Sequence, residues 1–92
     1  MTNKKAVDTM YKLRSEFIRN GCRNLKSCKK VAEKYAAKHG LNYRDGEPAI
    51  ISEPDSERVI LLMSNGRGGA HMDVVVSPLY GMMDEFDNIF IV

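Results

Sequence analysis

The chain contains little cysteine, little proline and no long run of apolar residues. Its 92 residues include 3 prolines and 2 cysteines, Cys22 and Cys28, which are too few for the disulfide framework of a small secreted protein. No segment approaches the ~18 consecutive apolar residues of a membrane-spanning helix, and charged residues interrupt the N-terminal region where a secretory signal needs an apolar stretch. We therefore expect a cytoplasmic protein with reduced thiols and no membrane partner.

The charge of the chain is small in total but unevenly distributed. A content of 43% hydrophobic and 28% charged residues is typical of a globular protein, and the length predicts a single domain, residues 1–92. The net charge of +2 combines a basic half, residues 1–45, which has 12 Lys and Arg against 4 acidic residues, with an acidic half, residues 46–92, which has 2 Arg against 8. This polarity indicates a surface that meets a negatively charged partner or the acidic half of a second copy in a homodimer.

The basic half is expected to form two amphipathic helices. The first ends near Asn20 and Gly21, and its apolar arc comprises Ala6, Val7, Met10, Leu13, Phe17 and Ile18. The second starts after an N-cap at Asn24 and ends at Gly40, and its apolar face comprises Leu25, Cys28, Val31, Ala32, Tyr35, Ala36 and a partly buried His39. The small Ala32 and Ala36 allow close approach of the first helix, so we expect an antiparallel pair.

The acidic half is expected to form a small sheet. Segments 49–53, 58–64 and 70–77 are short, rich in Val and Ile, and separated by turn residues, and 88–92 is a candidate fourth strand. Residues 59–63 are apolar without alternation, which indicates a central strand buried on both faces. The face away from the helices then needs a cover, either residues 79–92, a second copy or a partner.

These elements together predict the fold class. We expect an α+β fold in which an N-terminal antiparallel two-helix hairpin packs on one face of a small antiparallel β-meander of three or four strands.

The sequence offers no convincing metal or catalytic site. Five residues separate Cys22 from Cys28, unlike the tight pairs of structural zinc sites. His71 and Asp73 would share one face of a strand, as acid–base pairs do, but no nucleophile motif accompanies them, and a solvated polar sheet edge explains them better. We therefore expect no enzyme activity, no cofactor and no metal.

The clearest signal of function is a lysine repeat on the second helix. One lysine recurs every four residues on the solvent side, which defines a lysine ridge of Lys26, Lys30, Lys34 and Lys38. Such a ridge is either an ordinary solvated helix face or an electrostatic docking surface.

Two further segments are candidate binding elements. Arg67 lies at the tip of an NGRGG turn, where an exposed guanidinium can reach a carboxylate or phosphate. Phe86 and Phe90, in the acidic stretch DEFDNIFIV, resemble aromatic residues that insert into a partner's groove.

These signals predict a non-enzymatic, regulator- or inhibitor-type binding module that docks on another macromolecule, most plausibly a protein. The alternative is a weakly sequence-specific nucleic-acid-binding protein that uses the lysine ridge, because the ridge contains no arginine fork or exposed aromatic to read bases.

Overall fold

Two helices and five strands make up the described part of the chain. The computed structural model describes residues 3–54, 57–76 and 85–90, and for residues 85–90 the description is confined to the backbone. The helices are α1 (Asn3–Arg19) and α2 (Leu25–His39), and the strands are β1 (Asn42–Arg44), β2 (Ala49–Ser52), β3 (Arg58–Ser64), β4 (Ala70–Val76) and β5 (Glu85–Phe90). Neither helix is long and apolar enough to span a membrane.

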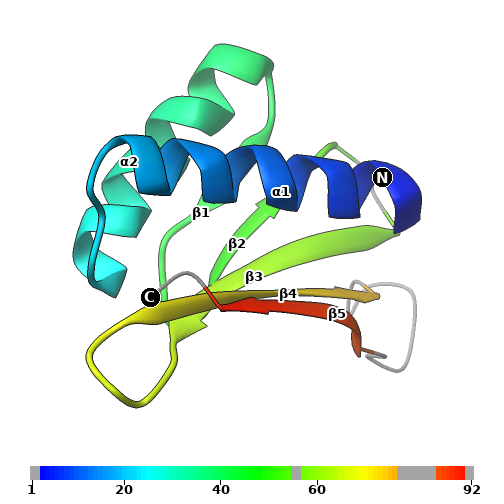
Figure 1. Ribbon diagram of the computed structural model, residues 1–92. Helices are drawn as coiled ribbons and strands as arrows, with labels where there is room; N and C mark the ends of the chain where they lie inside the picture. Colours follow the sequence, from blue (N-terminus) through cyan, green and yellow to red (C-terminus); the bar gives the residue numbers. More distant parts are fainter. Residues whose placement is uncertain (1–2, 55–56, 77–84, 91–92) are drawn as a thin grey trace.

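The strands form one antiparallel meander, and the helices cover one of its faces. The sheet order β1-β2-β3-β4-β5 follows the order of the chain, and every neighbouring pair is antiparallel. α1 packs against β3 and β4, whereas α2 packs against β1, β2 and β3 (Figure 1). The predicted α+β class, with helices on one face of an antiparallel meander, is therefore confirmed.

The sheet has five strands where three or four are predicted, and the differences lie at its two ends. β1 arises from a segment that reads as a turn in the sequence, and it pairs Asn42 with Ser52 and Arg44 with Ile50. Three residues are too few to show an alternating pattern, so this strand has no sequence signal. β5 starts at Glu85, three residues before the predicted strand, while residues 91–92 lie outside the described part.

Both helices end in the same left-handed glycine motif. Gly21 (φ 66°) and Gly40 (φ 68°) follow α1 and α2, and the next amide N–H in each case donates back, from Cys22 to the Phe17 carbonyl and from Leu41 to the Ala36 carbonyl, both at 2.9 Å. This pairing satisfies carbonyls that the helix end would otherwise leave without a donor. It also turns Cys22 inward, where its side chain joins the core.

The start of α2 is fixed by the predicted cap. Asn24 Oδ1 accepts from the Ser27 amide at 2.9 Å, and Ser27 Oγ accepts from the Asn24 amide at 3.4 Å, which forms a reciprocal capping box. Such a cap stabilises a helix by about 1 kcal/mol. It therefore also fixes where the lysine ridge begins.

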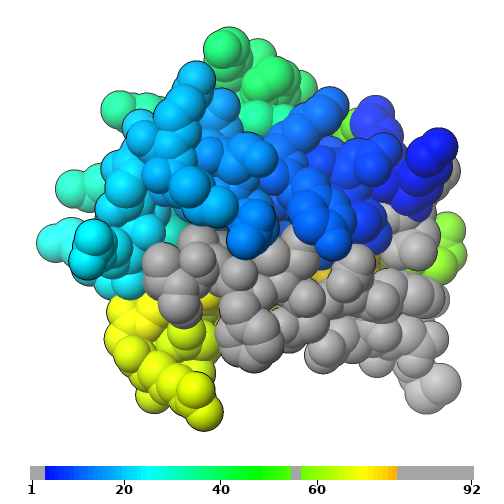
Figure 2. All heavy atoms as spheres, in the orientation of Figure 1, coloured from blue at the N-terminus to red at the C-terminus, as the bar shows by residue number. Residues whose placement is uncertain are grey.

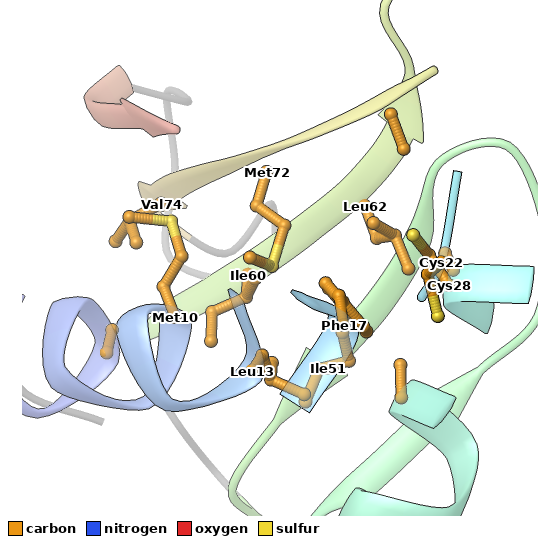
Figure 3. Packing of buried hydrophobic residues seen from close by; sticks show 14 residues of the cluster. Met10, Leu13, Phe17, Cys22, Cys28, Ile51, Ile60, Leu62, Met72 and Val74 are labelled. Atoms are coloured by element: carbon orange, nitrogen blue, oxygen red, sulfur yellow. The ribbon is translucent and has the colours of Figure 1, made fainter. Parts of the chain in front are cut away.

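The main core lies between the helices and the sheet (Figure 3). Its largest fully buried side chains are Met10, Leu13 and Phe17 from α1, with Ile51, Ile60, Leu62, Met72 and Val74 from the sheet. Burying each such side chain contributes roughly 1.5–3 kcal/mol. Ile18, predicted on the same arc, is instead 54% exposed. It lies 100° around the helix from Phe17, and that rotation takes it off the buried stripe.

The opposite face of the sheet carries a smaller apolar cluster. Val59, Leu61 and Val75 are only 4–7% exposed, and Ile50 and Met63 pack against them. Since Ile60 and Leu62 are buried on the helix side, β3 is buried on both faces, as predicted. Residues 79–92 were one candidate cover for this face. Residues 79–84 and 91–92 lie outside the described residues, and the backbone of 85–90 forms β5, which pairs with β4.

Candidate docking surface on the second helix

The lysine ridge is exposed and carries uncompensated charge. All four of its side chains, from Lys26, Lys30, Lys34 and Lys38, are solvent-exposed. In the described part of the chain none of them forms an ion pair, whereas Lys29 on the same helix places its Nζ 3.2 Å from Asp45 Oδ1. The chain thus pairs the lysine that faces β1 and leaves the ridge lysines without an ion pair among the described residues.

The Lys29 ion pair belongs to a small network at the corner between α2 and β1. Tyr43 Oη donates to Asp45 Oδ1 at 3.3 Å. The Lys29 ammonium, followed by the Gly46 amide, holds the pKa of Asp45 below its ordinary value. Burial, and then the Asp45 charge, raises the pKa of Tyr43 to about 12. This corner, formed by Lys29, Tyr43 and Asp45, is held by contacts within the chain and connects β1 to α2.

The spacing of the ridge works against the helix that carries it. Lysines four residues apart face each other on a helix, and a like-charge pair at this spacing is destabilising by about 0.2–0.5 kcal/mol. The ridge contains three such pairs in succession, Lys26/Lys30, Lys30/Lys34 and Lys34/Lys38. Taken alone, these three pairs cost α2 about 1 kcal/mol in total.

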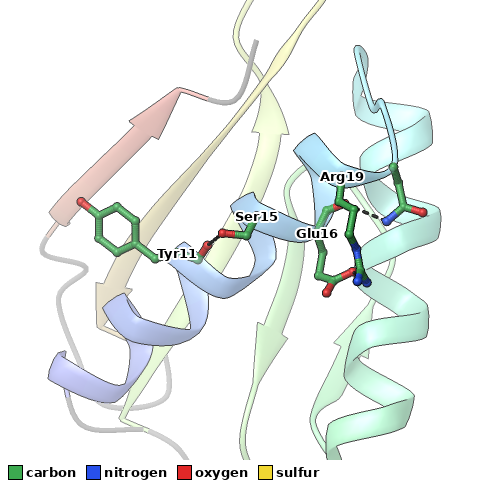
Figure 4. A network of polar contacts seen from close by, with 5 residues as sticks. Tyr11, Ser15, Glu16 and Arg19 are labelled. Atoms are coloured by element: carbon green, nitrogen blue, oxygen red, sulfur yellow. Dashed lines mark hydrogen bonds and ion pairs between the residues drawn. The ribbon is translucent and has the colours of Figure 1, made fainter.

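A groove runs between the ridge and the end of α1. It has a cavity volume of about 260 Å³, and the α1 side is formed by Glu16 and Arg19. On the α2 side it is lined by Lys30, Val31, Lys34, Tyr35, Lys38 and His39. Figure 4 shows Glu16 and Arg19 together on the last turns of α1 beside α2. Three of the four ridge lysines thus line a concave surface, which we call the α1–α2 groove.

An aromatic pair lines this groove. The rings of Tyr35 and His39 lie with centroids 4.2 Å apart and an interplanar angle of 32°. Partial burial, and then the Glu16 charge, raises the pKa of Tyr35. His39 is exposed, so its predicted partial burial is wrong. It comes in the last turn of α2, past the point where the sheet covers the helix. The i,i+4 spacing of the two rings was the signal that could have revealed their contact.

Arg67 lies in a different hollow. Asn65 Oδ1 accepts from the amides of Arg67 at 2.8 Å and Gly69 at 3.1 Å, which shapes the predicted turn between β3 and β4. A hollow of about 890 Å³ lies between this turn and the α1–α2 connection, with Arg67, Arg23 and Ile18 among its lining residues. Figure 2 shows the turn projecting in yellow from the same end of the molecule as the cyan start of α2. Arg67 is therefore exposed, as predicted, but it does not line the α1–α2 groove.

Phe86 and Phe90 are remote from the ridge along the sheet. Their backbone lies in β5, which pairs with β4 at one edge, and Phe90 is in register with His71. α2 packs toward the other edge, against β1, β2 and β3. This segment is thus a strand of the sheet rather than a separate tail, and it does not form one surface with the lysines.

The expected solvated setting of His71 and Asp73 is wrong. His71 Nε2 lies 3.6 Å from Asp73 Oδ2, and their side chains are only 16% and 9% exposed. Because β5 pairs outside β4, the strand that carries them is internal and not an edge. Both residues alternate with Met72 and Val74 of the main core, so they belong to the opposite face with Val75.

The two thiols are buried next to each other (Figure 3). Burial raises the pKa of Cys28 to about 12, and the neighbouring Cys22 thiol contributes to the rise. At neutral pH Cys28 is therefore a protonated thiol, which is a poor nucleophile and a poor metal ligand. Over residues 3–54, 57–76 and 85–90, no three His, Cys, Asp or Glu side chains gather as a possible metal site.

Comparison with known proteins yields no relative. No family model, no curated protein and no solved structure matches the chain significantly.

Proposed function

We propose that this protein is a non-enzymatic, cytoplasmic regulatory module that docks on an acidic surface of another protein through the lysine ridge. The observation that carries the proposal is the absence of any ion pair to the four ridge lysines among the described residues, although the same helix pairs Lys29 with Asp45. A row of like charges that weakens its own helix gains stability when a partner supplies carboxylates.

The charge of the rest of the molecule favours a protein over a nucleic acid. The acidic half carries 8 acidic residues against 2 arginines, and Glu16 lies in the α1–α2 groove itself. A phosphate backbone that follows the ridge would run past the Glu16 carboxylate, whereas a local acidic patch on a protein can meet the lysines alone.

The Tyr35–His39 pair supports a second candidate. Nucleic-acid bases stack on aromatic rings beside a basic groove, and this pair borders three of the ridge lysines. The alternative function is therefore weakly sequence-specific binding of nucleic acid on the same surface.

A charge-reversal experiment separates the two candidates. The double variant Lys30→Glu/Lys34→Glu is compared with Lys4→Glu/Lys12→Glu, which makes the same change of charge at exposed positions of α1. The probes are a glutamate-rich polypeptide, a random DNA duplex and a single strand, each at about 150 mM salt. We expect the polypeptide to bind the wild type and the α1 variant, and its affinity for the ridge variant to fall by at least about tenfold.

The salt dependence supplies the opposing result. If the ridge neutralises about four phosphates, log affinity for a duplex falls against log salt with a slope of roughly −3 to −4. Micromolar duplex binding with that slope, lost in the ridge variant, would replace the protein-docking function with the nucleic-acid one.

A further inference from the structure

We infer that the acidic partner element is an α-helix that packs across the α1–α2 groove and presents carboxylates four residues apart to the lysine ridge. The inference rests on the proposed function and specifies the chemistry and shape of the partner. Charge complementarity alone would allow any acidic segment to bind. Three features favour a helix: the repeat length of the ridge, the chemistry of the partner's backbone and the unequal charge of the two groove walls.

The repeat of the ridge matches that of a second helix. Four residues of helix rise 6 Å, so each lysine of the ridge lies about 6 Å further along the helix axis and about 40° further around it, over about 18 Å in all. A partner helix with Asp or Glu at i, i+4 and i+8 has the same repeat and stays in register along the ridge. Rows of this kind interdigitate when two helices cross at about −50°, the commonest packing class.

Backbone chemistry favours a helix over an extended strand. An acidic strand presents same-side carboxylates about every 6.6 Å, which long lysine side chains could still follow. Its backbone amides and carbonyls, however, would point to either side of that carboxylate row, and α2 offers them no partner because its own backbone groups are used within the helix. A partner helix satisfies its backbone internally and needs only side-chain contacts.

The two walls of the groove differ in charge. On the α1 wall, Arg19 Nη2 lies 2.5 Å from Glu16 Oε2, so these charges cancel locally. On the α2 wall, Lys30, Lys34 and Lys38 are uncompensated within the described chain. We therefore expect the partner helix to place its acidic row against α2 and an uncharged row against α1.

The groove suits one apolar side chain. Val31 and Tyr35 line it on the α2 side, where both are half-buried and pack against the main core. The volume of about 260 Å³ is smaller than the usual 300–1,000 Å³ of small-molecule sites. We therefore expect the partner helix to be amphipathic, with one large apolar residue beside its acidic row.

Two peptides of identical composition test the geometry. Each is a helical peptide of about 20 residues with four glutamates and one leucine, and circular dichroism establishes equal helicity. In the first the glutamates lie four residues apart, and in the second they are distributed around the helix. We expect the full-length protein to bind the first at least about tenfold more tightly, and Lys30→Glu/Lys34→Glu to remove that preference while Lys4→Glu/Lys12→Glu retains it.

Equal affinity for the two peptides would overturn the inference, and if both still depend on the ridge the proposed function stands. No ridge-dependent binding to any acidic polypeptide would overturn both. Preferential binding of a single-stranded oligonucleotide, or ridge-dependent dimers in sedimentation without peptide, would assign the groove to a nucleic acid or to a second copy and would also overturn the inference.

The apolar contact has a separate readout. Val31→Ala should weaken the binding of the first peptide, whose glutamates lie four residues apart, by about threefold to tenfold. This is the effect expected for losing apolar contact in a pocket. The same variant should bind a peptide whose leucine is replaced by alanine as the wild type does. If Val31→Ala weakens the binding of the leucine and the alanine peptide equally, the apolar row does not enter the groove and this part of the inference fails.

Discussion

Two basic surfaces of α2 differ in how their charge is satisfied. At the corner with β1, Lys29 contacts Asp45, whose carboxylate also accepts from Tyr43, and the interaction is complete within the chain. Along the ridge, Lys30 and its three counterparts find no such partner among the described residues. The contrast teaches that the number of lysines on a helix says little about function, whereas the lysines left without counter-charge identify the candidate surface.

The largest expected effect on binding comes from reversing one ridge charge. Lys34→Glu converts the repulsions with Lys30 and Lys38 into attractions, so the free energy of unfolding should rise by about 1 kcal/mol. Binding to the acidic probe should fall by about tenfold. Urea denaturation and titration measure the two quantities, and Lys34→Gln should give about half of each change. A destabilised Lys34→Glu protein would show that the ridge is not self-repelling.

The next effect comes from removing the cap of α2, which should destabilise the helix that carries both surfaces. Asn24→Ala removes the capping oxygen that accepts from the Ser27 amide, and the free energy of unfolding should fall by about 0.5–2 kcal/mol. The cap precedes both Lys26 and Lys29 in the helix. Its loss should therefore destabilise the helix at the ridge and at the corner with β1 together. Asn24→Asp keeps an acceptor and should retain the stability in thermal denaturation. Equal losses for the two variants would contradict the role of the cap.

A pair of adjacent substitutions sharpens the comparison directly. Lys29→Met keeps an unbranched apolar stem but loses the Asp45 contact, so stability should fall slightly while probe affinity stays within about twofold. Lys30→Met should behave in the opposite way, with unchanged or slightly higher stability and weaker binding. The same denaturation and titration experiments apply. Identical behaviour of the two variants would remove the distinction between corner and ridge.

The smallest effect is a pH dependence confined to the corner. The folded-state pKa of Asp45 is depressed, so its contribution to stability is present above the unfolded pKa of about 3.9 and is lost as pH falls through the folded value. The stability difference between wild type and Lys29→Met should therefore vanish in acid. Urea midpoints at pH 7 and at about pH 2.5 provide the check. A difference that persists in acid would mean that Lys29 acts through packing alone.

Local patterns predicted most of the elements, and tertiary contacts account for what they missed. The cap at Asn24, the stop at Gly40 and the limits of β3 depend on neighbouring residues, and all three agree with the structure. β1 exists because α2 and β2 hold it, so Tyr43 is half-buried in a segment with turn composition. Pattern reading therefore succeeded where the cause was local.

In the candidate site, too, the features with a local cause could be predicted from the sequence, and those that depend on tertiary contacts could not. The ridge follows from a repeat within one helix, and the exposure of Arg67 follows from its turn. The α1–α2 groove needs Glu16 and Arg19 brought beside Lys34, which no spacing in the sequence encodes. The setting of His71 was misjudged because the pairing of β5 outside β4 decides it.

The sheet order has a consequence for how fast the chain reaches its fold. Since each strand pairs with the strand that precedes or follows it in sequence, the loops closed during assembly of the sheet are short. Short loops carry a small entropic penalty, and folding rates rise as the sequence distance between contacting residues falls. We therefore expect the slow step to be the docking of α1 onto β3 and β4, which are far from it in the chain. Substitutions at Met10 or Leu13 should therefore slow folding more than substitutions in the β3–β4 turn.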